Sequence, residues 1–293
     1  MGCISFILRT SCTPRLFKGS KMKMRFVFFI LGLVVLLNSC FSPRHPDTFL
    51  SGLEKRMTAN GTDWIVFTIE EMDTVKISRV CYKTIDRSKD RQDRLLMELY
   101  YPPDFNFKKK LPAIILYSDH RTLIDETPYV SWAQLIAASG MIAITYQGTV
   151  VCEEDFIDLA HYIKKQETFL GVNSRMIGIL AGEAGIVRFA VTISTRIEDI
   201  PLQIRCAVCR IGRLPPPSEF APDFPVVILN AGQGHDGIKH SVERYVKDAT
   251  NLEINYKILE YTDGVHKFDV RQNTPKSREI IQQIIAFYKE ELF

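Results

Sequence analysis

Apolar strands and amphipathic helices alternate along the chain from about residue 112 to its end, and this alternation restricts the possible folds more than any other feature. The segment 112–117, PAIILY, is apolar throughout, as expected of a strand buried on both faces of a parallel sheet. A helical stretch at 130–140 follows it, and 141–148 is a second apolar strand. Strands joined in this way form right-handed crossovers onto one sheet, with helices on both faces. We therefore predict an α/β fold with a mostly parallel central sheet.

The rest of the chain continues this pattern without a dividing linker. Of the 293 residues, 46% are hydrophobic, which is enough to bury one large core. We predict one domain over 71–293, preceded over 41–70 by a tether and the start of the domain. Residues 42–61 are polar and contain prolines, which is typical of a tether. The predicted strands are 76–84, 95–102, 112–117, 141–148, 177–180, 204–212, 225–232 and 254–261, and the predicted helices are 130–140, 153–171, 186–197, 241–249 and 277–292.

The strand that begins at 177 runs into a cluster of small residues around one acid, Ala181-Gly182-Glu183-Ala184-Gly185. A sharp turn from a strand into a helix needs small residues two positions before and two after its centre, because the turn leaves no room there for branched side chains. Such a turn exposes its central side chain at the end of the strand. Glu183 is therefore the first candidate for a functional residue.

The first forty residues have the pattern of a targeting segment. Three basic residues between 21 and 25 precede the apolar run FVFFILGLVVLL, which suits a signal peptide and is too short to cross a bilayer of about 30 Å as a helix. The run ends in Leu-Asn-Ser-Cys40, which resembles a bacterial lipoprotein signal. This resemblance implies an acylated Cys40, a membrane anchor and a place in the bacterial cell envelope facing the periplasm. An uncleaved anchor is the alternative, and we expect the true start at Met22 or Met24.

Charge and cysteine usage exclude some classes of function. The formal net charge is only +3, and no basic stripe interleaved with aromatic residues is present, so we do not expect a nucleic-acid partner. Cys206 and Cys209 lie three apart in an apolar strand, where they face opposite sides, and no second pair stands at zinc-like spacing. We expect two buried thiols, and neither a metal nor a cofactor.

The chain from about Ile77 onward resembles the α/β-hydrolases, and most of all their dienelactone-hydrolase-related branch. The resemblance rests on ELYYP before the third strand, LPAIILYSD leading to an oxyanion loop, the turn RMIGILAGEAG, and GVHKFD at 264–269. The turn is similar to the G-x-S-x-G elbow of that family, with Glu183 in place of the nucleophilic serine. The last motif is similar to the G-x-H-x-F segment that carries the catalytic histidine. The loop 213–224 is too short for a cap domain, so we expect none.

The resemblance also implies roles for individual residues. His266 falls on the general base, and Asp236 is the best match to the acid that orients it, although it lies further from its strand than is usual in the family. The two oxyanion donors would be the backbone N–H of Ala184 and one from the loop after the third strand. That loop carries His120 and Arg121 where the family has a His-Gly pair.

Two readings of Glu183 make the protein an active hydrolase for an ester, a lactone or another small substrate. The carboxylate can be a nucleophile, as aspartate is in the haloalkane dehalogenases and epoxide hydrolases that share this fold. It can instead be a general base or, with His266 and either Asp236 or His235, a metal or water-positioning site. As a nucleophile toward an ordinary ester a carboxylate is weak and would form an anhydride, so serine-type esterase chemistry at Glu183 is not expected.

In the third reading, which we favour, the site has become a binding site for a small molecule and the protein is a pseudoenzyme. A buried carboxylate requires a partner, because burial without one is costly. We expect Glu183 to lie within hydrogen-bonding reach of His266, with His120 or Arg121 as its second partner.

Overall fold

The computed structural model describes residues 50–58, 63–88, 91–117, 124–149, 152–182, 185–210 and 212–293. All of these belong to one compact unit that spans Thr48–Phe293. The predicted targeting segment, with Cys40, lies outside the described residues. Within them, no helix is both long enough and apolar enough to cross a membrane.

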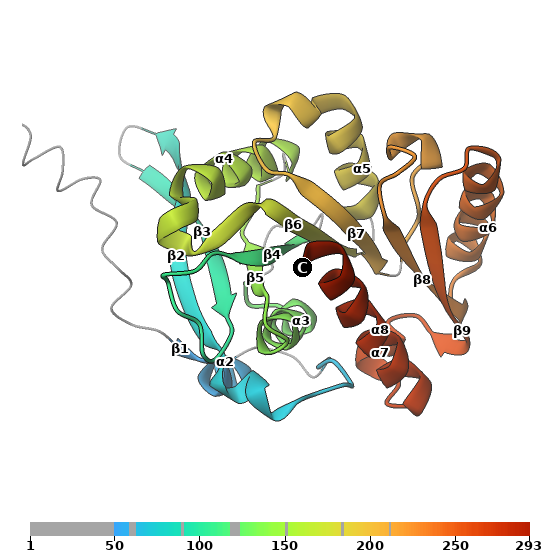
Figure 1. Ribbon diagram of the computed structural model, residues 1–293, viewed down its shortest axis with the longest axis horizontal. Coiled ribbons are helices and arrows are strands. Elements are labelled where there is room, and N and C mark those ends of the chain that lie inside the picture. The colour runs from blue at the N-terminus through green and yellow to red at the C-terminus, as the bar shows by residue number, and fades with distance from the viewer. Residues whose placement is uncertain are drawn as a thin grey trace, which may run out of the picture. The chain divides into compact units, whose positions relative to one another are not determined.

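The described strands form one 9-stranded sheet in the order β1-β2-β3-β5-β4-β6-β7-β8-β9 (Figure 1). The pairs from β5 through β4 to β9 are parallel, whereas β1, β2, β3 and β5 pair antiparallel along the other part of the sheet. The predicted α/β class with a mostly parallel sheet is confirmed. The strands are β1 (Leu50–Ser51), β2 (Lys76–Ser88), β3 (Arg91–Tyr101), β4 (Leu111–Tyr117), β5 (Ile142–Tyr146), β6 (Val172–Gly182), β7 (Ile204–Arg210), β8 (Val226–Gln233) and β9 (Tyr256–Val265).

Helices cover both faces of this sheet, with α3 and α8 on one side and α4 and α5 on the other (Figure 1). In the described part of the short loop between β7 and β8 the only regular element is a 3-10 turn, in agreement with the expectation that no cap domain is inserted there. The helices are α2 (Gly52–Thr58), α3 (Thr127–Ala138), α4 (Cys152–Leu170), α5 (Gly185–Arg196), α6 (Asp236–Asn251), α7 (Phe268–Arg271) and α8 (Pro275–Leu292), with 3-10 turns η1 (Glu70–Thr74), η2 (Ile197–Asp199) and η3 (Pro217–Glu219).

Side-chain alternation along the central strands explains the two helical layers. Ile114 and Tyr117 of β4 are three positions apart and so face opposite sides of the sheet. The Tyr117 ring contacts Phe156 of α4 and Phe189 of α5, at centroid distances of 5.2 and 5.6 Å. Ile114 instead lies on the side of α8. Because both faces of β4 are buried, its sequence is apolar at almost every position.

Helix α8 approaches β6 at a glycine. A Cβ atom at Gly178 would lie 2.7 Å from Cδ1 of Ile114 and 3.1 Å from the ring of Tyr288 on α8. The Tyr288 hydroxyl donates a hydrogen bond of 2.8 Å to the backbone oxygen of Ile179. The absence of a side chain at Gly178 therefore lets the terminal helix pack directly on the strand that leads to Glu183.

The structure differs from the predicted tether at residues 50–58, which form β1 and α2 and pack on the domain. The side-chain amide of Gln134 donates a hydrogen bond of 2.7 Å to the oxygen of Gly52, and Lys55 is only 3% exposed. The polar composition of this segment suggested a solvated tether, but the ammonium group of Lys55 pairs with the buried Glu98 and with the exposed Asp125. Composition alone does not distinguish a paired lysine from a solvated one.

Two other elements differ in their bounds from the prediction, and the prediction of two buried thiols was confirmed. The charged residues between the predicted strands 76–84 and 95–102 extend both strands and pair with each other, with Asp86 opposite Gln92. Helix α6 begins at Asp236, five residues earlier than predicted. Cys206 and Cys209 are buried free thiols, and burial raises the pKa of both far above the ordinary value of a thiol.

Candidate functional site

The turn around Glu183 stands where the motif predicts a strand to give way to a helix. Strand β6 ends at Gly182 and α5 begins at Gly185, while Glu183 and Ala184 lie outside the described residues. Gly182 pairs with Arg210, the last residue of β7. A Cβ atom at Gly182 would lie 3.3 Å from the Tyr129 hydroxyl and 3.6 Å from Nη1 of Arg210. A phenol and a guanidinium therefore lie next to the residue that precedes Glu183.

Arg210 belongs to a buried cluster that also contains the histidine motif. It is 4% exposed, and its Nε donates to Oδ2 of Asp269, which is 0% exposed. The indole Nε1 of Trp132 donates to the same carboxylate oxygen at 2.9 Å. The Arg210 guanidinium also lies over the ring of Tyr129, 5.9 Å from its centroid. This cluster joins α7, α3 and the end of β7.

The short segment that carries His266 is held from several sides. Strand β9 ends at Val265, whose N–H donates to the side-chain oxygen of Gln272 at 2.9 Å. Lys267, directly after the half-buried His266, has φ of 63° and ψ of 38°, a left-handed conformation that costs energy in a residue other than glycine. The oxygen of Asp269 accepts a hydrogen bond from the N–H of Val66 at 2.8 Å. Such strain persists only where surrounding contacts fix the backbone.

Asp236, the predicted triad acid, is exposed at the first position of α6, where a helix N-terminus favours a negative charge. The residue before it, His235, contacts the histidine segment instead. The rings of His235 and His266 are 5.5 Å apart between centroids and tilted by 55°. The structure thus brings His235 and His266 together, and the role of Asp236 as the orienting acid stays a prediction.

The predicted oxyanion residues all lie outside the part of the chain that the structure describes. Strand β4 ends at Tyr117, and the residues that follow it, including His120 and Arg121, lie outside the described part of the chain, as Ala184 does. Among the residues that are described, no group of three or more histidine, cysteine, aspartate or glutamate side chains could hold a metal ion.

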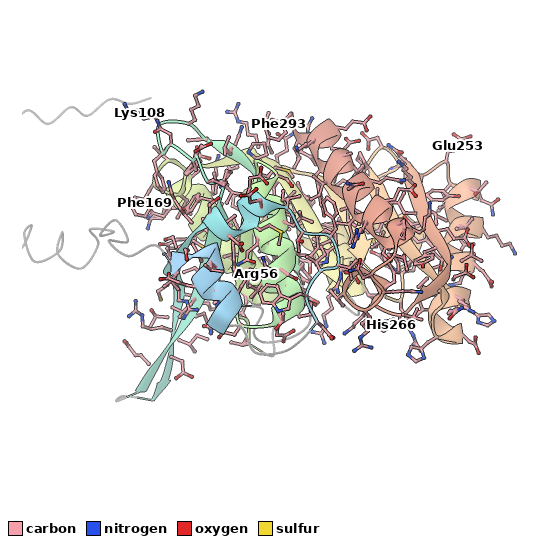
Figure 2. The ribbon with its side chains drawn as sticks, turned by 90° about the horizontal axis from the view of Figure 1, so that it is seen from below. Arg56, Lys108, Phe169, Glu253, His266 and Phe293 are labelled. Carbon is pink, nitrogen blue, oxygen red and sulfur yellow. The ribbon has the colours of Figure 1, made fainter. Side chains whose placement is uncertain are left out.

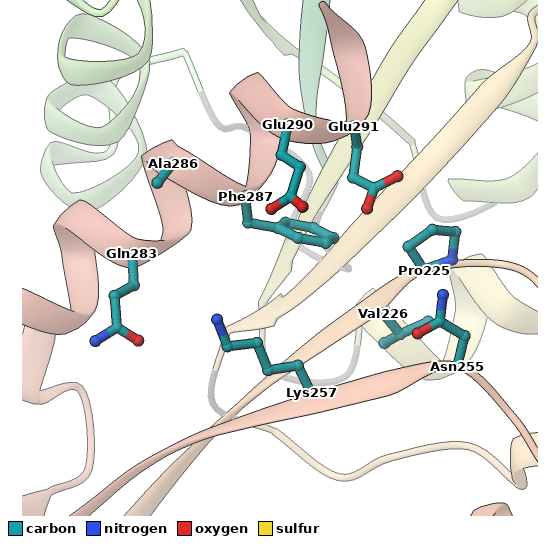
Figure 3. Close-up of a pocket in the computed structure, with 9 residues that line it drawn as sticks. All are labelled: Pro225, Val226, Asn255, Lys257, Gln283, Ala286, Phe287, Glu290 and Glu291. Carbon is teal, nitrogen blue, oxygen red and sulfur yellow. The ribbon is translucent and has the colours of Figure 1, made fainter.

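A surface hollow of about 350 Å³ lies elsewhere, beside the C-terminal half of α8 (Figure 3). Pro225 and Asn255 immediately precede β8 and β9, so this hollow is at the amino-terminal edge of the sheet. Lys257, Phe287 and the acids at the end of α8 also line it. His266 follows the other end of β9, so the hollow and the candidate site lie at opposite edges.

Sequence reasoning missed Arg210, Trp132 and Tyr129, and it gave Asp269 no role beyond its place in the motif GVHKFD. One signal was available for Arg210. A charged residue that ends an apolar strand stands at the carboxyl edge of a parallel sheet, where ligands bind. No comparable signal marks Trp132 and Tyr129, which lie on a helix that is buried almost throughout.

No known protein family matches the sequence, and a search of curated proteins also finds no match. Solved structures do match. Esterase 2 of Thermogutta terrifontis, phosphorylated by paraoxon, has a TM-score of 0.57 and 15% identity, covering 75% of this chain and 94% of its own. Its propionate-bound form has a TM-score of 0.57 and 13% identity, covering 75% and 95%.

An esterase of Rhizomucor miehei has a TM-score of 0.58 and 13% identity, covering 74% of this chain and 84% of its own. Identities this low establish the fold alone, and the dienelactone-hydrolase-related branch stays a prediction. The strand order supports the fold of these esterases. In the sheet β5 lies between β3 and β4, although it follows β4 in the chain, and all strands from β5 to β9 are parallel. The chain has the α/β-hydrolase fold.

Proposed function

We propose that this protein is a lipid-anchored α/β-hydrolase homologue that binds a small polar molecule at the carboxyl edge of its sheet and does not catalyse serine-type ester hydrolysis. The observation that carries the proposal is the position of Arg210 and Tyr129 beside Gly182, one residue before Glu183. A carboxylate at the elbow needs a partner, and a guanidinium and a phenol are suitable partners.

Such surroundings favour binding over nucleophilic attack. A positive charge near a carboxylate stabilises its ionised form and lowers its pKa, which weakens it as a base. In this proposal Arg210 takes the place that the sequence suggested for His120 or Arg121. The ligand then binds by hydrogen bonds to these groups.

The alternative function is an active hydrolase in which Glu183 positions a water molecule or acts as a base together with His266. The hydrogen bonds that fix the backbone around His266 favour this alternative. Residues other than glycine that are held in a left-handed conformation by surrounding contacts, as Lys267 is, are frequent at catalytic sites. A kinetic comparison separates the two functions.

We expect the purified full-length protein to hydrolyse nitrophenyl acetate and butyrate no faster than its Glu183→Ala variant, because no activated hydroxyl stands at the elbow. The measurement is the initial rate at matched protein concentration. The Glu183→Ser variant, which returns a hydroxyl to the elbow, serves as the comparison for any gain. A wild-type rate at least tenfold above the alanine variant, an increment of about 1.4 kcal/mol in transition-state stabilisation, would favour the hydrolase.

The membrane anchor has its own test. Radiolabelled palmitate, supplied to a bacterial host that expresses the full chain, is expected to enter the wild type and not Cys40→Ala. The physical reason is that the acyl chains attach through the Cys40 thiol, which alanine lacks. The Cys12→Ala variant is the matched control and should label like the wild type. Equal labelling of wild type and Cys40→Ala contradicts the anchor.

A further inference from the structure

We propose that the amino-terminal edge of the sheet docks on an anionic phospholipid bilayer through a basic surface, named here the basic edge, formed by Lys108, Lys109, Lys110, Lys164 and Arg175. This surface lies away from the candidate site and has no part in the chemistry proposed for it. The proposal does not depend on the identity of the ligand.

The basic edge is one continuous surface, because its segments are joined by contacts. Lys108 to Lys110 end the loop between β3 and β4, and Leu111 donates its N–H to the oxygen of Gly171 at 2.9 Å. The Tyr101 hydroxyl donates to the oxygen of Leu170 at 3.2 Å. The Phe105 ring fills the space above Gly171, whose φ of 66° and missing side chain allow that contact. The lysine loop is thereby fixed against the end of α4 and the start of β6.

Positive charge exceeds negative charge on this surface. Lys110 and Lys164 share Glu167, at nitrogen-to-oxygen distances of 2.7 and 3.3 Å. Lys108, Lys109 and Arg175 are exposed, and among the described residues no acid pairs with them. One shared acid among five cations leaves a local field that attracts an anionic surface. Residues 1–47 contain seven basic residues and one acid, so residues 48–293 carry a net charge of −3, and the basic edge is a local positive excess on a domain that is otherwise net acidic.

Aromatic residues accompany the lysines, as they do in proteins that lie at the membrane interface. The Phe105 and Phe107 rings contact each other with centroids 4.8 Å apart, and the Tyr101 ring stacks on Phe105, also at 4.8 Å. Phe107 and Phe169 remain half-buried. Figure 2 shows Lys108 and Phe169 on the same side of the domain. A bilayer offers both the anionic headgroups and the apolar boundary that such a combination fits.

The described part of the chain begins at the same edge of the sheet. Leu50 pairs with Ile77, and the neighbouring Lys76 pairs with Tyr101 at the end of β3. The chain therefore enters the domain at the edge of the sheet from which the lysine loop leaves. Cys40 precedes Leu50 by ten residues, which reach at most about 35 Å when extended. A lipid on Cys40 would hold this edge near the membrane.

His266 follows β9 at the carboxyl edge, and Figure 2 shows it on the side opposite Lys108. A domain docked by the basic edge would therefore present its candidate site to the aqueous phase. This orientation suits a receptor for a soluble small molecule, and it does not suit an enzyme that takes its substrate from the bilayer.

Vesicle binding tests the proposal with the full-length chain carrying Cys40→Ala, so that no acyl chain contributes. Binding to phosphatidylcholine vesicles that contain phosphatidylglycerol is measured by sedimentation at low salt, with pure phosphatidylcholine as the baseline. Adding Lys108→Gln and Lys109→Gln is expected to weaken binding to the anionic vesicles by about 25-fold, because each basic residue near an anionic surface strengthens binding about fivefold. Binding to the neutral vesicles should not change.

The matched control carries Arg244→Gln and Lys247→Gln, which remove the same charge from the exposed face of α6. It should bind anionic vesicles like the parent, and high salt should abolish the difference between the two variants. Equal loss in both variants, or no loss in the lysine variant, overturns the proposal. Tighter capture of a short DNA duplex than of anionic vesicles also overturns it. Because the assay does not involve the candidate site, it is independent of the esterase result.

Discussion

Asp269→Ala is expected to lower the free energy of unfolding by about 3–5 kcal/mol, the usual cost of removing one partner from a buried ion pair. The change leaves the guanidinium of Arg210, which is 4% exposed, without its buried counter-charge. It also removes the acceptor for the indole of Trp132. Since a domain is stable by only about 5–15 kcal/mol in total, the variant should be close to unfolding at room temperature. Urea denaturation followed by circular dichroism measures the loss.

Two control variants identify the charge as the cause. Asp236→Ala removes an exposed acid and should change stability by no more than about 0.5–1 kcal/mol, through the start of α6. The double change Arg210→Met with Asp269→Leu should be more stable than Asp269→Ala alone, because it removes both charges of the Arg210–Asp269 pair together. If Asp269→Ala and Asp236→Ala are equally stable, the buried pair does not hold the histidine segment.

The cluster also explains how the histidine motif meets the elbow strand. Asp269 lies three residues after His266, and Arg210 lies opposite Gly182, so their ion pair joins the two motifs across 59 positions of sequence. A short sequence motif contains no information about such a pair. It depends on β6 and β7 being neighbours and on α7 folding back over their ends.

Much of the fold could be predicted, because parallel strands buried on both faces leave a strong pattern. The strand predicted at 112–117 is β4 at Leu111–Tyr117, and the helix predicted at 277–292 is α8 at Pro275–Leu292. Prediction failed where charged residues are paired inside the domain. The polar, proline-containing composition of 42–61 predicts a tether, and it does not reveal that Lys55 pairs with residues as distant in sequence as Glu98 and Asp125.

The candidate site was predicted only in its local parts. His266 follows strand β9, and the left-handed backbone of Lys267 directly after it was not predicted. Asp236 is exposed on α6, and its neighbour His235 makes the contact with His266. A shift of one residue in the turn before α6 decides whether His235 or Asp236 faces His266. A short sequence motif does not determine that shift. Glu183 lies outside the described residues, so its predicted contact with His266 stays a prediction.

Glu98→Ala is the second variant for which we expect a large effect, a loss of about 3–5 kcal/mol in the free energy of unfolding. Glu98 on β3 is 0% exposed and accepts hydrogen bonds from Lys55 at 3.2 Å, from Arg79 Nη2 at 2.5 Å and from the Tyr100 hydroxyl at 2.7 Å. In the alanine variant the ammonium group of Lys55, which is 3% exposed, keeps only Asp125 as an acid of this network. The Asp125 carboxylate lies 2.9 Å from it and is largely exposed, so it compensates poorly for a buried charge. Chemical denaturation measures the global loss.

The same variant should loosen α2 before the rest of the domain unfolds. Lys55 is the buried charge of that helix, and the hydrogen bond from Gln134 to Gly52 holds only its first residue. Amide exchange over 50–58 is therefore expected to accelerate by at least a hundredfold, which corresponds to about 2.7 kcal/mol of local protection. Glu71→Ala, which removes an exposed acid on η1, is the control and should leave that exchange unchanged. Unaltered exchange in Glu98→Ala would show that α2 is held by its other contacts, such as the ion pair between Arg56 and Asp73 at 2.9 Å, and that Glu98 fixes only β2 and β3.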